Sequence, residues 1–88
     1  MKYDVEYSKS AMNTIKKMDS STSKLIRTWI EKNLINTKNP RIKGKALTDD
    51  LKGLWRYRVG DYRILVDIQD NKIVILILDI GYRSKIYL

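Results

Sequence analysis

The stretch LWRYRVGDYRI, residues 54–64, places Arg56, Arg58 and Arg63 among apolar residues at alternating positions. Alternate positions of a β-strand point to the same face, and the two-residue connection Gly60-Asp61 between such segments predicts a hairpin. Counting outward from this turn, Arg58 faces Arg63 and Arg56 faces Leu65. The opposite face of the predicted hairpin is apolar and consists of Trp55, Tyr57, Val59, Tyr62, Ile64 and Val66.

Directly opposed like charges destabilise a sheet, so the facing arginines need an explanation. Either Asp61 or Asp67 pairs with one of them, or an anion from another molecule bridges the two guanidinium groups. Guanidinium groups match phosphate oxygens well, and Asp67 lies two same-face steps from Arg63. The second explanation is therefore favoured, and the sequence predicts an arginine-lined phosphate site that Arg83 would complete.

Metal-assisted or histidine-based chemistry finds no support in the sequence, which contains neither histidine nor cysteine, and its acidic residues lack ligand spacing. No metal or cofactor is expected. Arginine is not a base near neutral pH, but it can hold a phosphodiester and stabilise the charge that develops in its transition state. With RNA as substrate, the 2′-hydroxyl would supply the nucleophile, and metal-free cleavage is chemically reasonable.

Further candidates for RNA binding lie outside the hairpin. Tyr82 and Tyr87, near the end of the chain, can stack on unpaired bases or donate hydrogen bonds. Lys43, Lys45 and Lys52 belong to a turn-rich stretch and form either a solvated surface or a rim that grips phosphates.

The composition favours an anionic partner. Lysine and arginine total 18 against 10 acidic residues, a net charge of +8, which suits nucleic acid, an acidic protein or an anionic membrane surface; charge that serves only solubility is the alternative. The longest apolar run, residues 73–78, is far shorter than the roughly 20 residues of a membrane span. The N-terminus lacks the apolar core of a signal peptide, so we expect a cytoplasmic protein.

The elements that must position these side chains follow from hydrophobic periodicity. We expect strands over residues 2–7, 54–59, 62–68 and 73–80, and helices over about 9–18 and 22–35, capped by Ser8 or Ser10 and by the run DSSTS. Residues 36–53 are expected to form a loop, with a short turn near Ala46-Leu47. Gly81 would end the last long strand, and YRSKIYL would form a final strand or an extended tail.

The predicted fold class is α+β, a single small domain over residues 1–88. Its order is β-α-α-β-β-β with a possible last strand, and a helical hairpin packs on one face of a mostly antiparallel twisted sheet. Strand 73–80 would be central and would turn Val74, Leu76 and Leu78 toward the arginine-bearing face. An apolar surface rimmed by positive charge suits an acidic amphipathic segment of a partner.

The string LKGLWRYRVGDYRILVDIQDNKIVILILDIGYRSKIYL, residues 51–88, closely resembles the C-terminal half of bacterial type II toxins of the RelE/ParE superfamily, RelE-like toxins in particular. The matching features are the L-x-G-L-x-R-x-R-V-G-D-Y-R-I hairpin, the apolar strand after a short acidic turn, and the closing G-x-R-x-x-x-Y. The N-terminal strand and helices also fit, so the resemblance covers nearly the whole chain.

This resemblance implies a ribosome-dependent mRNA endonuclease that is neutralised by a cognate acidic, RelB-like antitoxin in a hetero-oligomeric complex. It implies that Arg58 and Arg63 hold the scissile phosphate while the 2′-hydroxyl attacks, leaving a 2′,3′-cyclic phosphate and a 5′-hydroxyl. Arg83 would assist the leaving oxygen and Tyr87 would orient the nucleotide. The implied catalytic residues are Arg56, Arg58, Arg63, Arg83 and Tyr87.

Two positions depart from the family pattern. Arg56 stands where lysine is common, and Tyr82 stands where histidine is frequent. The general base therefore stays open among Lys52, Lys45, Tyr82 and the ribosome itself. The alternative function within the superfamily is a ParE-like poison of DNA gyrase, which needs no phosphate-cleaving site; a degenerate, merely nucleic-acid-binding member is the third.

Overall fold

A five-stranded sheet with the strand order β1-β5-β4-β3-β2 forms the centre of the computed structural model, which describes residues 1–86. β1 pairs in parallel with β5, and the other neighbours are antiparallel. The strands are β1 Asp4–Tyr7, β2 Lys45–Ala46, β3 Trp55–Val59, β4 Tyr62–Gln69 and β5 Val74–Tyr82. The predicted α+β class with a mostly antiparallel sheet is confirmed, although the additional strand precedes the hairpin instead of ending the chain.

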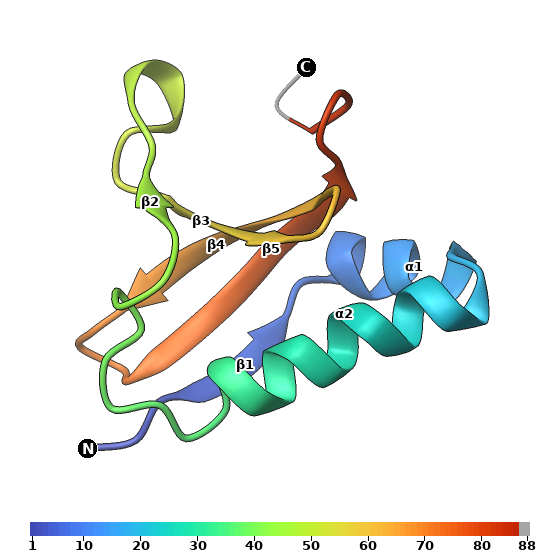
Figure 1. Ribbon diagram of the computed structural model, residues 1–88. Helices are drawn as coiled ribbons and strands as arrows, with labels where there is room; N and C mark the ends of the chain where they lie inside the picture. Colours follow the sequence, from blue (N-terminus) through green and yellow to red (C-terminus); the bar gives the residue numbers. More distant parts are fainter. Residues whose placement is uncertain (87–88) are drawn as a thin grey trace.

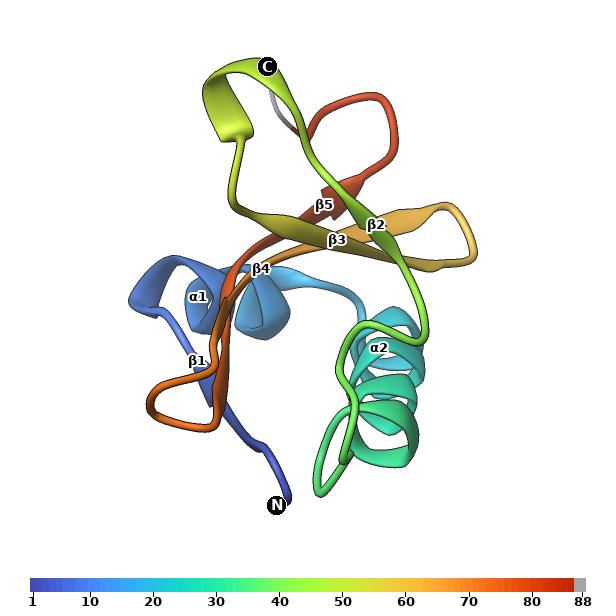
Figure 2. The ribbon, with the colours of Figure 1, turned by 90° about the vertical axis from the view of Figure 1, so that its left-hand side faces the viewer.

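The two helices lie on the same side of the twisted sheet, as both Figure 1 and Figure 2 show. Helix α1 spans Lys9–Lys17, and the side chain of its N-cap Ser8 accepts a hydrogen bond from the Ala11 N–H. Helix α2 spans Ser20–Asn33, two residues earlier at each end than predicted. It starts early because Asp19, the first residue of the DSSTS run, is the N-cap and accepts from the Thr22 N–H.

The hydrophobic core lies between the helices and the sheet. Tyr57 is completely buried at its centre, and its ring lies 5.5 Å from that of Trp29 on α2. Its hydroxyl donates to the carbonyl oxygen of Pro40, which satisfies the only polar atom of the side chain. The core residues are Ala11, Ile15, Ile26, Ile30, Leu34, Tyr57, Val59, Ile64, Val66, Ile75, Ile77 and Ile80.

The predicted register of the hairpin is confirmed at every position of β3. Tyr57 pairs with Ile64, Arg58 with Arg63, and Arg56 with Leu65. Gly60 has a φ of 58°, the left-handed value that a glycine-first hairpin turn requires. The arginine-bearing side of the hairpin is therefore the side away from the helices, which we call the open face.

The end of the chain differs from the prediction. β5 continues through Gly81 to Tyr82, because Gly81 pairs with Arg63 and Tyr82 with Tyr62. Residues 83–86 then form a tight turn, in which the N–H groups of Lys85 and Ile86 both donate to the carbonyl oxygen of Tyr82. The expectation of a final strand or an extended tail is wrong for these residues.

Residues 36–53 are more ordered than the predicted loop. They contain β2 and the short 3₁₀ helix η1, Asp49–Leu51. The segment that carries η1 rises from the open face, opposite the helices, and the turn of residues 83–86 rises on the same side (Figure 1). These two projections flank the part of the sheet that carries the arginines.

Candidate functional site

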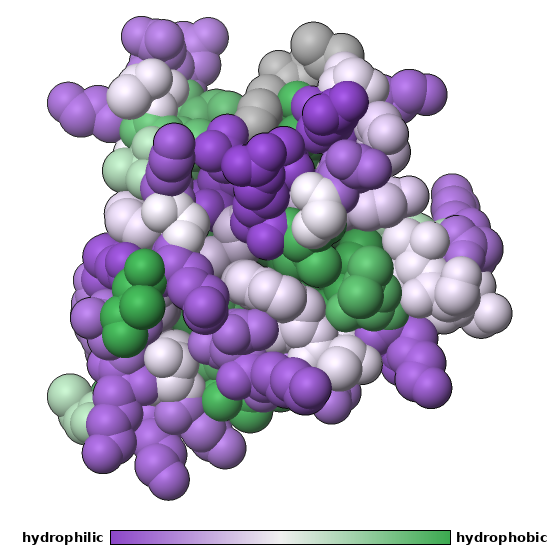
Figure 3. All heavy atoms as spheres, viewed as in Figure 1, coloured by the Kyte–Doolittle hydropathy of each residue, from purple (hydrophilic) through white to green (hydrophobic). Residues whose placement is uncertain are grey.

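The open face brings the hairpin arginines together in rows that run across the sheet. One row consists of Arg58, Arg63 and Gly81, and the next contains Arg56, Leu65 and Asp79. Figure 3 shows strongly hydrophilic side chains gathered on this side of the molecule, between the two projecting segments. Arg58 is exposed, while Arg56 and Arg63 are half-buried.

Arg63 and Arg83 are both anchored to the backbone of the hairpin turn. The Nη1 atom of Arg63 donates to the carbonyl oxygens of Gly60 and Tyr62, each at 3.1 Å. The backbone N–H of Arg83 donates to the carbonyl oxygen of Asp61 at 2.8 Å. These bonds hold both arginines at the same end of the sheet, beside Arg58.

None of the aspartates near the arginines, Asp61, Asp67 and Asp79, forms an ion pair with them. In the part of the chain that the structure describes, the only ion pair joins Arg41 to Asp70, at 2.9 Å. Asp67 instead accepts a hydrogen bond from the side-chain amide of Gln69 at 3.1 Å. No carboxylate within residues 1–86 therefore forms an ion pair with Arg58 or Arg63, in agreement with the anion-binding interpretation.

Gly81 makes room for the C-terminal turn, a role that the sequence pattern did not reveal. It pairs with Arg63 and so faces the open side, where a Cβ atom would lie 3.3 Å from the Cβ of Ile86. Ile86 is almost fully buried at 7% exposure. The chain therefore folds back over the sheet next to Arg63 before it reaches Tyr87, the predicted catalytic tyrosine, which lies outside the described residues.

The remaining predicted residues are distributed unevenly. Lys45, on β2, pairs with Arg56 and faces the open side, whereas Lys43 and Lys52 are exposed in the loops on either side of it. Tyr82 pairs with Tyr62, and their rings meet edge to face at 5.5 Å. This register places Tyr82 on the helix-facing side, so the structure does not bring it to the arginines.

Hydrogen bonds from side chains tie the loop before β2 to the sheet. Trp55 donates its indole N–H to the carbonyl oxygen of Lys43 at 2.8 Å. Arg41 forms a bidentate ion pair with Asp70, which also accepts a hydrogen bond from the hydroxyl of Tyr3 at 2.6 Å. The bonds from Arg41 and Tyr3 lower the pKa of Asp70, so this carboxylate stays ionised. Asp70 thus connects the loop before β2 and the residue that precedes β1 to the β4–β5 turn.

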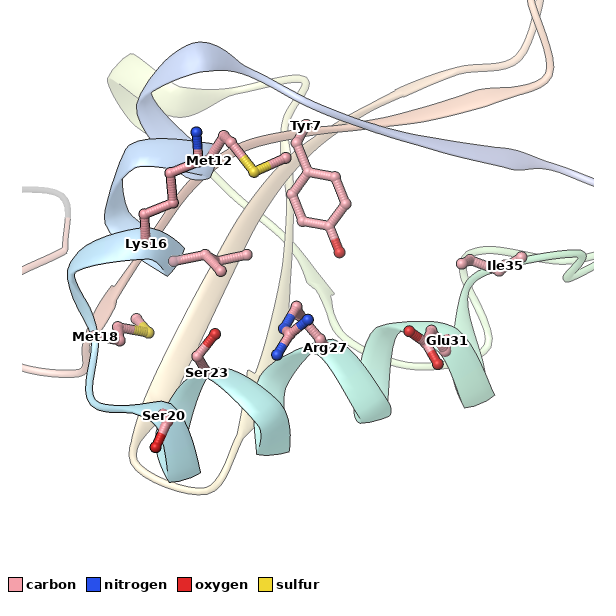
Figure 4. A pocket seen from close by; sticks show the side chains of 10 residues that line it. Tyr7, Met12, Lys16, Met18, Ser20, Ser23, Arg27, Glu31 and Ile35 are labelled. Carbon is pink, nitrogen blue, oxygen red and sulfur yellow. The ribbon is translucent and has the colours of Figure 1, made fainter.

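A second concave region lies on the other side of the molecule, between α1, β1 and α2. This groove has a volume of about 600 Å³, and Figure 4 shows Tyr7 and Arg27 directed into it. Burial raises the pKa of the Tyr7 hydroxyl. Apart from Tyr7, its titratable residues are Lys16, Arg27 and Glu31, and none of the predicted site residues lines it.

Within residues 1–86, no group of acidic side chains is arranged to hold a metal ion. None of the helices in the same range is long and apolar enough to cross a membrane.

The sequence is similar to that of toxins from type II toxin–antitoxin systems. The model of the family described as the ParE toxin of type II toxin–antitoxin systems matches residues 5–87. Toxin RelE of Mycobacterium tuberculosis is 43% identical over 49 residues, which is 56% of this chain and 50% of the relative. The match therefore spans only half the length of that curated relative.

Solved structures show the same fold over almost the whole chain. The toxin–antitoxin complex RelBE2 from Mycobacterium tuberculosis matches with a TM-score of 0.84 and 25% identity, covering 97% of this chain and 95% of that one. The isolated RelE toxin of Escherichia coli matches with a TM-score of 0.72 and 20% identity, covering 97% and 90%. At 20% identity, the similarity to the Escherichia coli toxin shows a shared fold and nothing more.

Proposed function

Because the chain belongs to the ParE toxin family of type II toxin–antitoxin systems, we propose that this toxin is a ribosome-dependent endoribonuclease that cleaves mRNA and so stops translation. The observation that carries the proposal is the facing pair Arg58 and Arg63, with which no carboxylate forms an ion pair within the described residues. A gyrase poison would have no need of this pair, whereas a phosphodiester between the two guanidinium groups would offset their repulsion.

In the proposed reaction, Arg58 and Arg63 bind the non-bridging oxygens of the scissile phosphate and stabilise the negative charge that grows on them. The 2′-oxygen forms a bond to phosphorus and its proton passes to a base. The bond from phosphorus to the 5′-oxygen breaks, and that oxygen takes up a proton. The products are a 2′,3′-cyclic phosphate and a 5′-hydroxyl, with no metal ion in the mechanism.

The other predicted residues surround this centre. Arg83, fixed next to the hairpin turn by its bond to Asp61, contributes positive charge at one side of the phosphate. Arg56 and Lys45 extend the cationic surface along β3. Tyr87 follows directly after Ile86 and is proposed to orient or stack on the nucleotide. None of the arginines can accept the 2′-hydroxyl proton near neutral pH.

We further propose an acidic, RelB-like antitoxin as the partner of this toxin in a hetero-oligomeric complex. Structures of toxin–antitoxin complexes with the same fold have been solved from Mycobacterium tuberculosis and Escherichia coli. Leu65 and Leu76 are half-buried on the open face beside the arginines, whereas Val74 is nearly buried. An acidic amphipathic segment would cover these leucines and neutralise the arginines together.

Mapping of RNA ends in a translation reaction tests the proposed activity. Purified toxin is added to a reconstituted translation system, and the 5′ ends of the mRNA are mapped with and without ribosomes. Cuts that keep one phase relative to the codons and need ribosomes support the proposal. Intact mRNA together with gyrase-linked DNA breaks in a parallel supercoiling reaction would refute it and favour the gyrase alternative.

A further inference from the structure

The short strand β2 adds a cation to the open face beside Arg56. Its register pairs Lys45 with Arg56 and Ala46 with Trp55, so Lys45 and Arg56 point to the same side of the sheet. Residues directly opposed in antiparallel strands have Cβ atoms about 5 Å apart. Lys45 and Arg56 therefore form a second row of two cations, next to the row of Arg58 and Arg63.

The backbone around Lys45 is held in place by close contacts with β3. Gly44 has a φ of 89°, and a Cβ atom on it would lie 2.3 Å from the carbonyl oxygen of Arg56 and 2.6 Å from the indole nitrogen of Trp55. On the other side, the same indole nitrogen donates to the carbonyl oxygen of Lys43. Lys45 thus starts from a fixed point on the sheet, although its side chain is exposed.

The spacing of the two rows matches a repeating anion. A strand advances about 3.4 Å per residue, so the rows at Arg56 and Arg58 lie about 7 Å apart. Successive phosphates along an extended RNA strand have a similar separation. Only an RNA backbone that runs along β3 would place one phosphate on each row.

We infer that Lys45 and Arg56 form a subsite for the phosphate adjacent to the scissile one, so that the open face binds two consecutive phosphates of the mRNA. This inference rests on the proposed function and specifies how the substrate lies on the site. Beyond Arg56, the second row continues with Leu65 on β4 and Asp79 on β5. The negative charge of Asp79 repels a phosphate and so keeps it on the β2 side of the row. The RNA backbone therefore passes over β3 toward the loop of residues 47–54.

The test combines a variant of the protein with a modified substrate. Ribosome-bound mRNAs carry a neutral methylphosphonate in place of the phosphate on one or the other side of the scissile bond. On natural mRNA, Lys45→Met should lower kcat/KM about tenfold, the effect of losing one charge-assisted contact. On the mRNA whose adjacent phosphate is neutral at the subsite, the same substitution should have no further effect.

The matched control is Lys72→Met, which removes an exposed lysine in the β4–β5 turn at the opposite end of the sheet and should change neither rate. Arg56→Gln serves as a second variant and should show the same dependence on the methylphosphonate as Lys45→Met. If Lys45→Met lowers kcat/KM by the same factor on natural mRNA and on both methylphosphonate mRNAs, the inferred subsite is refuted. If wild-type protein fails to cleave natural mRNA on ribosomes, the proposed function itself fails, which this control reaction reveals separately.

Discussion

Removal of one of the facing arginines should leave the stability of the fold unchanged but reduce the rate of cleavage. Arg58 is exposed and makes no side-chain hydrogen bond or ion pair within residues 1–86, whereas the side chain of Arg63 donates only to the carbonyl oxygens of Gly60 and Tyr62. Opposed like charges cost a few tenths to about 1 kcal/mol. Arg58→Gln should therefore leave the free energy of unfolding unchanged within about 0.5 kcal/mol, or raise it. For a domain of this size, that corresponds to a change in Tm of less than about 4 °C.

The same substitutions should remove most of the cleavage. Each arginine is proposed to stabilise charge that is larger in the transition state than in the bound substrate, a contribution of about 2–4 kcal/mol, or roughly 30- to 1000-fold in rate. Single-turnover cleavage of ribosome-bound mRNA measures this loss, and thermal unfolding of the same preparations measures stability. Arg58→Gln and Arg63→Gln should also be expressed without an antitoxin.

Tyr57→Ala provides the opposite pattern, because it lies on the same strand with its side chain in the core. Truncation of a large buried aromatic side chain costs about 3–5 kcal/mol, so Tm should fall by more than 10 °C, about 4–8 °C for each kcal/mol. A comparable fall in the arginine variants would mean that the facing pair is structural. Undiminished toxicity of a folded Arg58→Gln, Arg63→Gln double variant would refute the nuclease mechanism.

Three further predictions concern binding, the backbone and pH. If the open face contacts two phosphates, a rise in salt from about 50 to 200 mM should weaken RNA binding about sevenfold, from the slope for single strands; a flat response in a filter-binding assay would contradict this. Gly44→Ala should lower the free energy of unfolding by about 1–3 kcal/mol more than Gly53→Ala, through overpacking, because both glycines have positive φ but only Gly44 has atoms in the space of a Cβ; thermal unfolding of both variants measures the difference. Hydrogen bonds from Ser21 and Thr22 lower the pKa of Asp19 to about 2. Since this value lies below that of the unfolded chain, the cap stabilises the fold above about pH 4 and loses its effect as the pH falls toward 2, so Asp19→Asn should lose less Tm over this range.

The hairpin could be predicted from the sequence because all its determinants are local. Alternation assigns Trp55 and Tyr57 to one face, and Gly60 fixes both the turn and the residues that oppose each other. The facing arginines follow from that register alone. The N-caps and the two helices are similarly local, and the errors there are limited to the choice of N-cap and to helix ends that differ by one or two residues.

The parts that the sequence did not reveal depend on contacts between distant segments. Strand β2 consists of two residues without any periodic pattern, and it pairs with β3 because Gly44 can approach the Arg56 carbonyl closely. Gly81 reads as a strand end, yet it stays within β5 because Ile86 occupies the space that a side chain would take. Tyr82 was expected to bind RNA, but the continuation of β5 places it on the helix-facing side of the sheet.

The division of β3 between two faces explains why the register must be fixed so firmly. Trp55, Tyr57 and Val59 contribute to the core or pack against it, while Arg56 and Arg58 face outward on the same strand. A slip by one residue would bury guanidinium groups and expose the aromatic rings. The left-handed glycine of the turn prevents such a slip on one side of β4. On the other side, the bulge between the pairs of Leu65 and Val66, where the register skips Leu78, adjusts the pairing. The fold can therefore tolerate a repulsive pair of arginines on the open face, because the free energy that holds them opposed comes from the other face of the same strand.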